Sequence, residues 1–345
     1  MKRFLLAASL LALAASPSFA RDQIRIVGSS TVYPFSTVVA EAFAKSTGMK
    51  TPIIESTGTG GGMKLFCAGA GEDTPDFVNA SRKMKKAEFE ICKQNGVGEI
   101  VEFRIGYDGL TIASSVAGPD TNLTRKQIFQ ALAKQIPDKD GKLIDNPYKN
   151  WNEIDASLPA EKIEVLGPPP TSGTRDSFAE LFLKKGAQEF ETLAALEQKD
   201  VTAFDPIWKT IRTDGAYVEA GENDNLIVQK IQANPAAFGV FGYSFLEENK
   251  KTLKAASIEG DQPNYEFISN GNYKGSRVLY FYMKKAHLGL VPGMMEYITE
   301  FTSDKAIGAD GYLLDKGLVA LKTCDAELSA ANTLTLPNLD GEFLK

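Results

Sequence analysis

Three short turns combine glycine with serine or threonine, the residue types best suited to holding an oxyanion. They lie at residues 28–31, 56–62 and 167–173, each between a short apolar run and a segment with helical spacing. Free N–H groups and the positive dipole end at a helix start attract anions, and glycine lets an oxyanion approach the backbone. Three such turns that converge would form an oxyanion site. For any one turn, simple N-capping by its Ser or Thr is the alternative.

Three charged side chains near these turns could contact the same anion. Arg82 and Arg175 carry guanidinium groups that can bind an oxyanion with two hydrogen bonds, and Asp108 could accept the proton of a protonated oxyanion. Each has a structural alternative. Arg175 could form surface ion pairs with the neighbouring acidic residues, Arg82 could belong to a solvated basic cluster, and Asp108 could form an Asx turn before glycine.

Nucleophilic catalysis would have to use the single histidine of the chain, His287. We expect this residue on the surface, beside two lysines. No G-x-S-x-G motif surrounds Ser30 or Ser172, so a secreted phosphatase or esterase is a minor alternative. The glycine run at 58–64 lacks the Gly-Lys-Ser/Thr ending of a nucleotide-binding loop. With one histidine, zinc sites built on several histidines are excluded, and we expect no catalytic residue, metal or cofactor.

The overall composition is that of an acidic globular protein. The chain has 345 residues, 43% of them hydrophobic, with 38 Lys plus Arg against 44 Asp plus Glu and a formal net charge of −6. This length favours two domains or one two-lobed domain with ample core material. A net negative charge argues against nucleic acid as a partner, because phosphate backbones are bound by basic faces. Any anion site must therefore be local.

The elements around the turns alternate between strand and helix, which predicts α/β layers with mainly parallel strands. Two further runs, 103–113 and 277–283, are strand-like and are placed to cross between lobes. The three strand-to-helix units are expected at 24–27 and 35–44, at 52–55 and 63–68, and at 163–166 and 174–184.

The first twenty residues have the pattern of a secretory leader peptide. Lys2 and Arg3 precede an apolar run at 4–15, and Ser18-Phe19-Ala20 forms a small-x-small cleavage site. We expect cleavage after Ala20 and export to the periplasm. Loss of Lys2 and Arg3 takes the net charge from −6 to −8. An uncleaved membrane anchor is the alternative.

Three cysteines remain after this cleavage, in an oxidising compartment. Cys67 and Cys92 are close enough in sequence to close one loop, which would leave Cys324 unpaired. Three small buried free cysteines are the alternative. Because no C-x-x-C motif occurs, redox catalysis and cysteine-based metal binding are poorly supported.

Together these motifs resemble the periplasmic phosphate-binding proteins of ABC-type phosphate importers, over residues 24–321. The resemblance implies a type II periplasmic binding protein fold, with two α/β lobes and two hinge crossovers near Tyr107 and Arg277. Lobe 1 would comprise 21–106 and 277–345, and lobe 2 would comprise 107–276. The motifs that carry the resemblance are 28–34 (GSSTVYP), 56–62 (STGTGGG), 76–82 (DFVNASR), 107–109 (YDG) and 172–175 (SGTR).

The resemblance also implies which residues contact phosphate. Some members carry an Asp at the position of Arg82 and an Arg at the position of Pro168, so this chain departs from that pattern twice. We therefore predict that Asp108 is the proton acceptor and that Arg82 and Arg175 supply positive charge. The predicted phosphate-binding residues are Ser30, Thr31, Val32, Thr59, Gly60, Ser81, Arg82, Asp108, Ser172, Gly173, Thr174 and Arg175.

The function that the resemblance implies is capture of inorganic phosphate and its delivery to an inner-membrane ABC permease, by a monomer that is not an enzyme. If Asp108 does not face the ligand, another oxyanion such as sulfate or a phosphonate becomes the alternative. A secreted sensor or adhesion protein on the same fold is a further alternative.

Overall fold

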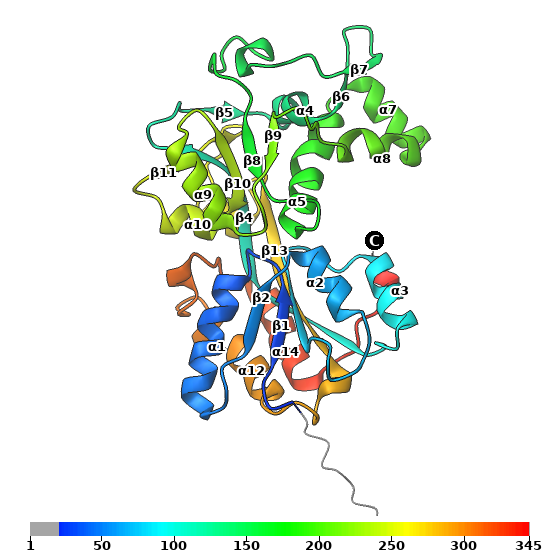
Figure 1. The fold of residues 1–345 in the computed structure, drawn as a ribbon, viewed down its shortest axis with the longest axis vertical. Helices are drawn as coiled ribbons and strands as arrows, with labels where there is room; N and C mark the ends of the chain where they lie inside the picture. The colour runs from blue at the N-terminus through cyan, green and yellow to red at the C-terminus, as the bar shows by residue number, and fades with distance from the viewer. Residues whose placement is uncertain (1–20, 345) are drawn as a thin grey trace, which may run out of the picture.

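The computed structural model describes residues 21–344, which form two lobes stacked along the long axis of the molecule (Figure 1). The predicted leader peptide at 1–20 lies outside the described residues. Two long strands, β4 (Ile100–Ser115) and β13 (Ser276–Lys284), run from one lobe into the other as antiparallel partners. These are the two strand-like crossings that the sequence predicts, and they carry one continuous sheet through both lobes.

Lobe 1 lies below the crossing in Figure 1 and contains the first two predicted strand-to-helix units. Its strands β1 (Arg25–Gly28), β2 (Ile53–Ser56) and β3 (Phe77–Ala80) are parallel, as predicted, with β1 between the other two. Helix α1 (Tyr33–Thr47) begins with a proline in its first turn, ends at a left-handed glycine, and buries an apolar stripe that includes Phe35, Val39 and Phe43. Helix α2 (Thr59–Phe66) follows β2.

Lobe 2 lies above the crossing and contains the third predicted unit (Figure 1). Strand β8 (Val165–Gly167) pairs in parallel with β9 (Tyr217–Glu219) and β10 (Phe238–Gly242), and β10 pairs antiparallel with β4. Helix α5 (Gly173–Phe178) starts directly after the third turn and continues into a π-helical turn, Ala179–Lys184. The strand order across both lobes is β2-β1-β3-β13-β4-β10-β8-β9, with β11 also on β4.

The other elements cover the sheets and fill the ends of the lobes. They are α3 (Lys86–Gln94), β5 (Asn122–Leu123), α4 (Arg125–Leu132), β6 (Gln135–Pro137), β7 (Leu143–Asp145), α6 (Lys185–Ala187), α7 (Glu191–Lys199), α8 (Val201–Lys209), α9 (Asp224–Ala233), α10 (Tyr243–Glu248), β11 (Leu253–Ala255), β12 (Ser257–Ile258), α11 (Tyr265–Asn270), α12 (Met294–Phe301), α13 (Asp304–Ile307) and α14 (Thr323–Thr335).

Each lobe has its own apolar core, and the cores lie on either side of the crossing. Lobe 1 stacks Phe103 of β4 on Phe281 of β13, with ring centroids 4.6 Å apart. Lobe 2 packs Phe178 against Phe182 and Trp151 against Phe238. Because each core buries its own aromatic side chains, each lobe has an independent source of hydrophobic stability.

One disulfide bond joins two helices of lobe 1. Cys67, at the end of α2, is bonded to Cys92 in α3, which confirms the predicted pair. Cys324, at the start of α14, is exposed and not in a disulfide bond. Both outcomes follow the sequence prediction.

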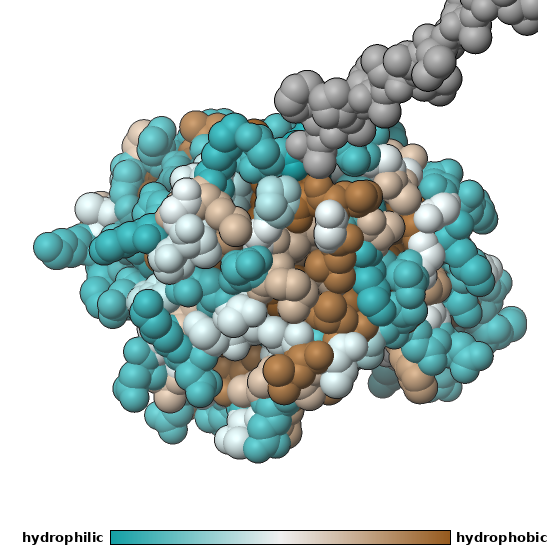
Figure 2. Space-filling view, turned by 90° about the horizontal axis from the view of Figure 1, so that it is seen from below, coloured by the Kyte–Doolittle hydropathy of each residue, from teal (hydrophilic) through white to brown (hydrophobic). Residues whose placement is uncertain are grey.

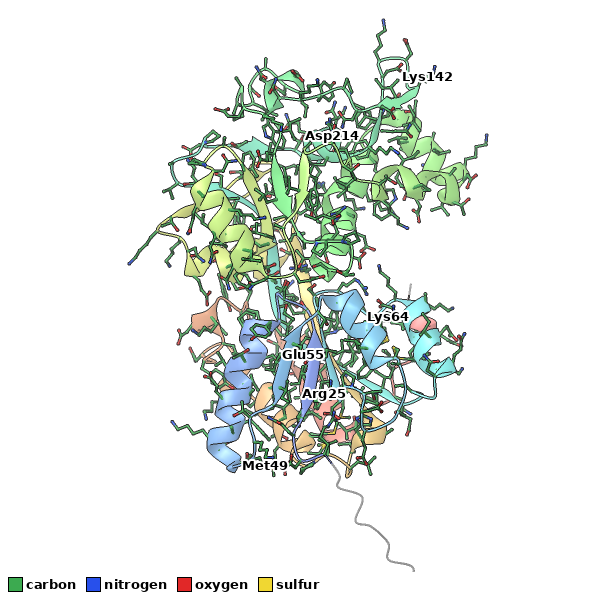
Figure 3. The ribbon with its side chains drawn as sticks, in the orientation of Figure 1. Arg25, Met49, Glu55, Lys64, Lys142 and Asp214 are labelled. Atoms are coloured by element: carbon green, nitrogen blue, oxygen red, sulfur yellow. A yellow bond between two sulfur atoms is a disulfide. The ribbon has the colours of Figure 1, made fainter. Side chains whose placement is uncertain are left out.

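The far end of lobe 1 carries a group of apolar side chains on an otherwise hydrophilic face (Figure 2). Met49 lies at this end, just after α1 (Figure 3), and its side chain is partly exposed. No helix within residues 21–344 combines the length and the apolar character needed to cross a bilayer.

Candidate functional site

The first predicted turn enters the space between the lobes directly after β1. Gly28 has a positive φ of 124°, and a side chain at this position would collide with the backbone of Asn79 in β3, so only glycine fits. The turn then buries the hydroxyl groups of Ser29, Ser30 and Thr31 ahead of helix α1. The strand-to-helix transition therefore places three hydroxyls at the edge of lobe 1 that faces lobe 2.

The second turn, in lobe 1, and the third turn, in lobe 2, also lie at this edge. Gly173 at the start of α5 lies so close to Thr59 and Ser81 of lobe 1 that a methyl group at this position would clash with both hydroxyls. Thr59 Oγ1 lies 3.3 Å from Ser81 Oγ, and the Gly60 N–H donates to the carbonyl of Thr171 in lobe 2 at 3.0 Å. The structure thus brings all three predicted turns together.

At the centre of this junction lies a buried ion pair between the two crossing strands. The guanidinium of Arg277 in β13 donates to Asp108 Oδ2 in β4 through Nε at 2.9 Å and Nη2 at 2.8 Å. The same Nη2 lies 3.1 Å from Thr31 Oγ1 and 3.2 Å from Thr174 Oγ1, and these two hydroxyls are 3.0 Å apart. One arginine therefore binds a hydroxyl from each lobe.

Three polar atoms around this cluster have no hydrogen-bond partner among the described residues, namely Arg277 Nη1, Asp224 Oδ2 and Glu222 Oε2. Arg277 is 8% exposed, yet its Nη1 has no hydrogen-bond partner within residues 21–344. Asp224, at the first position of α9, is 1% exposed; its Oδ1 lies 3.4 Å from Ser30 Oγ, and its Oδ2 has no partner within the same range. Buried polar atoms normally have hydrogen-bond partners, so these atoms indicate a place where a polar ligand could supply them.

The carboxyl groups here are strongly perturbed. Burial raises the pKa of Asp108, while Arg277 and the backbone N–H of Tyr243, 2.9 Å from Asp108 Oδ1, oppose the shift. Burial also raises the pKa of Asp224 to about 7, and the charges of Asp108 and Glu222 add to the increase. Burial raises the pKa of Glu222 as well, although the Thr171 hydroxyl donates to its Oε1. Perturbed groups of this kind cluster at functional sites.

Two of the predicted arginines are engaged elsewhere. Arg82 donates to Glu88 of its own lobe and, at 2.7 Å, to Asp176 of lobe 2. The Arg175 guanidinium stacks 4.3 Å from the centre of the Tyr217 ring. Neither guanidinium forms a hydrogen bond to Thr31 or Thr174 among the described contacts, and contact of either arginine with an anion stays a prediction.

The remaining predicted residues lie at the junction with defined local roles. The Val32 N–H lies 3.3 Å from Ser29 Oγ, and the Thr174 N–H donates to Ser172 Oγ at 3.1 Å, so Ser172 also caps α5. Ser177 Oγ lies 3.4 Å from the carbonyl of Ser81, which adds another contact between the lobes.

The sequence interpretation missed Arg277 and Asp224 as site residues. Arg277 appears in the sequence only as the first residue of the apolar run 277–283, and Asp224 appears as one of several polar residues before a helix. The available signal was weak. An arginine that opens an otherwise apolar strand requires a buried counterion, and Asp108 in the other crossing strand is that counterion.

The prediction that His287 lies on the surface is wrong. His287 is 0% exposed, with Nδ1 2.6 Å from Asp76 Oδ1 and Nε2 3.2 Å from the Ala70 carbonyl. Its neighbour Lys284 is also buried, and its ammonium group donates to the Gly69 carbonyl at 2.6 Å. Burial is possible because local oxygen acceptors satisfy these nitrogens. The histidine is therefore bonded into the body of lobe 1.

No group of three or more His, Cys, Asp or Glu side chains in the described part of the chain has the arrangement of a metal site. The chemistry available at the junction is hydrogen-bond donation and proton exchange with a small oxyanion.

Comparison with known proteins identifies the class. A family model described as a PBP superfamily domain matches residues 13–305. The chain is 31% identical over 251 residues to the SphX protein of Synechococcus elongatus, an alignment that covers 71% of this chain but 63% of the length of SphX. It is 30% identical over 303 residues to the phosphate-binding protein PstS of Staphylococcus saprophyticus, covering 86% of this chain and 80% of PstS.

Solved structures agree. A protein from Planctomyces limnophilus described as a possible phosphate binding protein is 28% identical, with a TM-score of 0.57 over 90% of this chain and 97% of its own. An ABC-type phosphate transport receptor from Vibrio cholerae, 20% identical, has the same fold with a TM-score of 0.56 over 86% of this chain and 99% of its own. The chain therefore belongs to the PBP superfamily and, within it, to the PstS-like family of phosphate-binding proteins.

Proposed function

We propose that this protein captures inorganic phosphate between its lobes in the periplasm and, as a monomer, delivers it to an inner-membrane ABC permease. The observation that carries the proposal is the buried Arg277 guanidinium. Its Nη1 is unpaired among the described residues, and its Nη2 lies between Thr31 of lobe 1 and Thr174 of lobe 2. A tetrahedral oxyanion at this point would satisfy a free donor and bind both lobes at once.

The energetics of such a site do not require a positively charged protein. A hydrogen bond to a charged group contributes roughly 1.5 to 3 kcal/mol net. Arg277 together with the hydroxyls of Ser30, Thr31 and Thr174 could supply several such bonds, and a Kd of about 1 μM corresponds to about 8 kcal/mol. The ligand must part the Thr31 and Thr174 hydroxyls, which are now in contact. We therefore propose that the lobes open and close about the β4 and β13 crossings.

Phosphate is the preferred ligand because several relatives that match most of this chain are named for it. PstS of Staphylococcus saprophyticus is a phosphate-binding protein, and the Vibrio cholerae relative is a phosphate transport receptor of the ABC type. We extend the ligand and the permease partner from these relatives to this chain. His287 is buried, and its hydrogen-bond partners are Asp76 and the Ala70 carbonyl rather than a serine of the turns. This arrangement supports binding rather than catalysis.

We propose 21–106 and 277–345 as lobe 1 and 107–276 as lobe 2, with a leader cleaved after Ala20. The apolar clusters support this division, because one gathers residues from Leu110 to Tyr273 together with Val319, and the other two gather residues outside that range. Arg21, the first residue after the proposed cleavage site, already belongs to the fold, since its guanidinium pairs with Asp76.

The twelve residues predicted from the sequence are retained as the proposed site, in two groups. Thr31, Asp108 and Thr174 contact Arg277, and Ser30 contacts Asp224. The others form the walls and the contacts between the lobes, and these residues are Val32, Thr59, Gly60, Ser81, Arg82, Ser172, Gly173 and Arg175.

Isothermal titration calorimetry of the secreted protein with phosphate and with sulfate tests the proposal. We expect saturable heat with phosphate, and the titration with sulfate measures how far the site distinguishes the two oxyanions. Arg277→Lys keeps a counterion for Asp108 but loses the planar fork, so it should weaken phosphate binding by about tenfold or more. Arg212→Lys, at another buried arginine that pairs with Asp214, is the matched control and should bind normally. Clear binding of sulfate without binding of phosphate would overturn the assignment.

A further inference from the structure

The centre of the proposed site combines Arg277 with several carboxyl groups. These belong to Asp108 in β4, Glu222 before α9 and Asp224 in α9, and the charge of Arg277 is the one that opposes the raised pKa of Asp224. Like charges in one buried place disfavour each other, and a phosphate dianion would add two more negative charges. A proton on one of these groups would therefore favour phosphate binding.

Asp108 is unsuited to carry that proton, because both of its carboxyl oxygens already accept hydrogen bonds. Oδ2 accepts from Nε and Nη2 of Arg277, and Oδ1 accepts from the Tyr243 N–H. Its ionised form is thus the form that the surrounding donors favour. Asp108 orients Arg277 and balances its charge.

Asp224 has the opposite environment. It is 1% exposed, its Oδ2 has no hydrogen-bond partner within residues 21–344, and its Oδ1 has only the 3.4 Å contact with Ser30 Oγ. Burial raises its pKa to about 7, the charges of Asp108 and Glu222 raise it further, and Arg277 and Ser30 oppose the shift. A carboxyl group in this setting gains most from carrying a proton and giving it to an acceptor.

We infer that the carboxyl group of Asp224 is protonated in the complex and donates a hydrogen bond to the phosphate dianion, so that binding above neutral pH takes up one proton. This inference rests on the proposed function. No covalent bond changes: ionised Asp224, one solvent proton and the hydrogen phosphate dianion form a complex in which the neutral acid faces the anion. Glu222 Oε2 also lacks a partner within residues 21–344, but its Oε1 accepts a hydrogen bond from the Thr171 hydroxyl and its side chain is only partly buried, so Asp224 is the better donor.

The sign of the pH dependence follows directly. Below about pH 7, Asp224 already carries its proton before the ligand arrives, so this group takes up none on binding. As the pH rises above that value, free Asp224 ionises, the site must bind a proton together with phosphate, and affinity falls by up to about tenfold per pH unit. Above about pH 8 the fraction of phosphate monoanion also falls by about tenfold per pH unit, so a slope there comes either from Asp224 or from selection of the monoanion, and the Asp224→Asn variant separates the two.

Calorimetry in two buffers of different ionisation enthalpy measures the proton count. At about pH 8.5 we expect the wild-type protein to take up about one proton per phosphate bound. Asp224→Asn donates an N–H without titrating, so its uptake should fall close to zero, and its affinity should no longer decrease between about pH 7.5 and 9. Asp140→Asn, in an exposed turn of lobe 2 beside Lys142 (Figure 3), is the matched control and should behave as wild type.

Two further measurements distinguish Asp224 from Glu222 and replace the variant if it does not fold. Glu222→Gln should retain the uptake, and loss of the uptake in this variant but not in Asp224→Asn would overturn the assignment. If Asp224→Asn does not fold, infrared difference spectra of the wild type decide: phosphate should increase the absorption of a protonated carboxylic acid, and no increase contradicts the inference. Phosphate binding without proton uptake overturns the inference alone, whereas absence of phosphate binding overturns the proposed function as well.

Discussion

Arg277 shows how a single side chain can organise a site that no local motif defines. Its guanidinium balances Asp108 and reaches the hydroxyls of Thr31 and Thr174. Burying both charges costs desolvation energy that the pair only partly recovers, so its presence is weak evidence for stability. Removal of one partner is different, because the remaining charge stays buried without compensation. The pair therefore makes both the fold and the site depend on Asp108.

Asp108→Asn should lower the free energy of unfolding by about 3 to 5 kcal/mol, because Arg277 would lose its counterion in a buried place. Urea denaturation followed by circular dichroism measures this change. Asp140→Asn, at an exposed position, should leave the transition midpoint unchanged. Equal midpoints for both variants would show that the buried pair does not carry this energy.

Thr174→Val should weaken phosphate binding by about tenfold, because one hydroxyl donor near a buried charge is lost while the volume of the side chain is kept. Calorimetry at a fixed pH measures the change, and circular dichroism checks that the fold is intact. The exposed Thr192, changed to Val, is the control. Unchanged affinity in Thr174→Val would limit this residue to contacts within the protein.

At the scale of elements, the strand-to-helix units of lobe 1 depend on a covalent bond as well as on packing. The bond between Cys67 and Cys92 fastens the end of α2 to α3, across a sequence separation of 25 residues. This brings stability to the helix that carries Thr59 and to the loop that carries Arg82. Helix α2, which forms one wall of the proposed site, is therefore linked covalently to α3 at its C-terminal end.

Replacing both Cys67 and Cys92 by Ser should destabilise the protein by about 3 kcal/mol, through release of a loop of this length in the unfolded chain. Thermal and urea unfolding in the absence of reductant measure the loss. Cys324→Ser, at the exposed free cysteine, should have no measurable effect. A neutral double variant would show that α2 and α3 are held by packing alone.

At the scale of the whole molecule, the contacts between the lobes are numerous and mostly polar. Arg82 reaches Asp176, Gly60 reaches Thr171, and Thr31 touches Thr174. Polar contacts of this kind can be replaced by contacts with water at modest cost in free energy. Opening the apolar core within a lobe would expose hydrophobic side chains to water, which costs much more. This distribution of contacts fits the proposed opening between the lobes, in which each lobe stays intact.

Gly173→Ala should prevent full closure, because its methyl group would collide with Thr59 and Ser81 of the opposite lobe. We expect phosphate affinity to fall by at least about tenfold and the decrease in radius of gyration on adding phosphate, measured by small-angle X-ray scattering, to be lost. Gly98→Ala, at a position with open space around it, is the matched control. A normal decrease in radius in Gly173→Ala would show that close approach at this point is not needed.

Local patterns were sufficient for much of the fold. The alternation of apolar runs, turns and helical spacing predicts β1, β2 and β8 with their following helices, and the runs 103–113 and 277–283 predict the two crossing strands. The pairing of Cys67 with Cys92 also follows from their order. These features depend on neighbours within a few dozen residues, and such neighbours leave a pattern in a single sequence.

The composition of the site depended on long-range contacts that leave no such pattern. Asp224 meets Ser30 across 194 residues, and Arg277 meets Thr31 across 246. The sequence by itself determined the three hydroxyl-bearing turns, because their geometry is local. Only the tertiary structure decided that Arg277 and the Tyr243 N–H occupy both oxygens of Asp108, whereas Asp224 Oδ2 has no partner within residues 21–344. Hydrogen-bond partners in a buried junction are set by which strands become neighbours, and that is a property of the folded sheet.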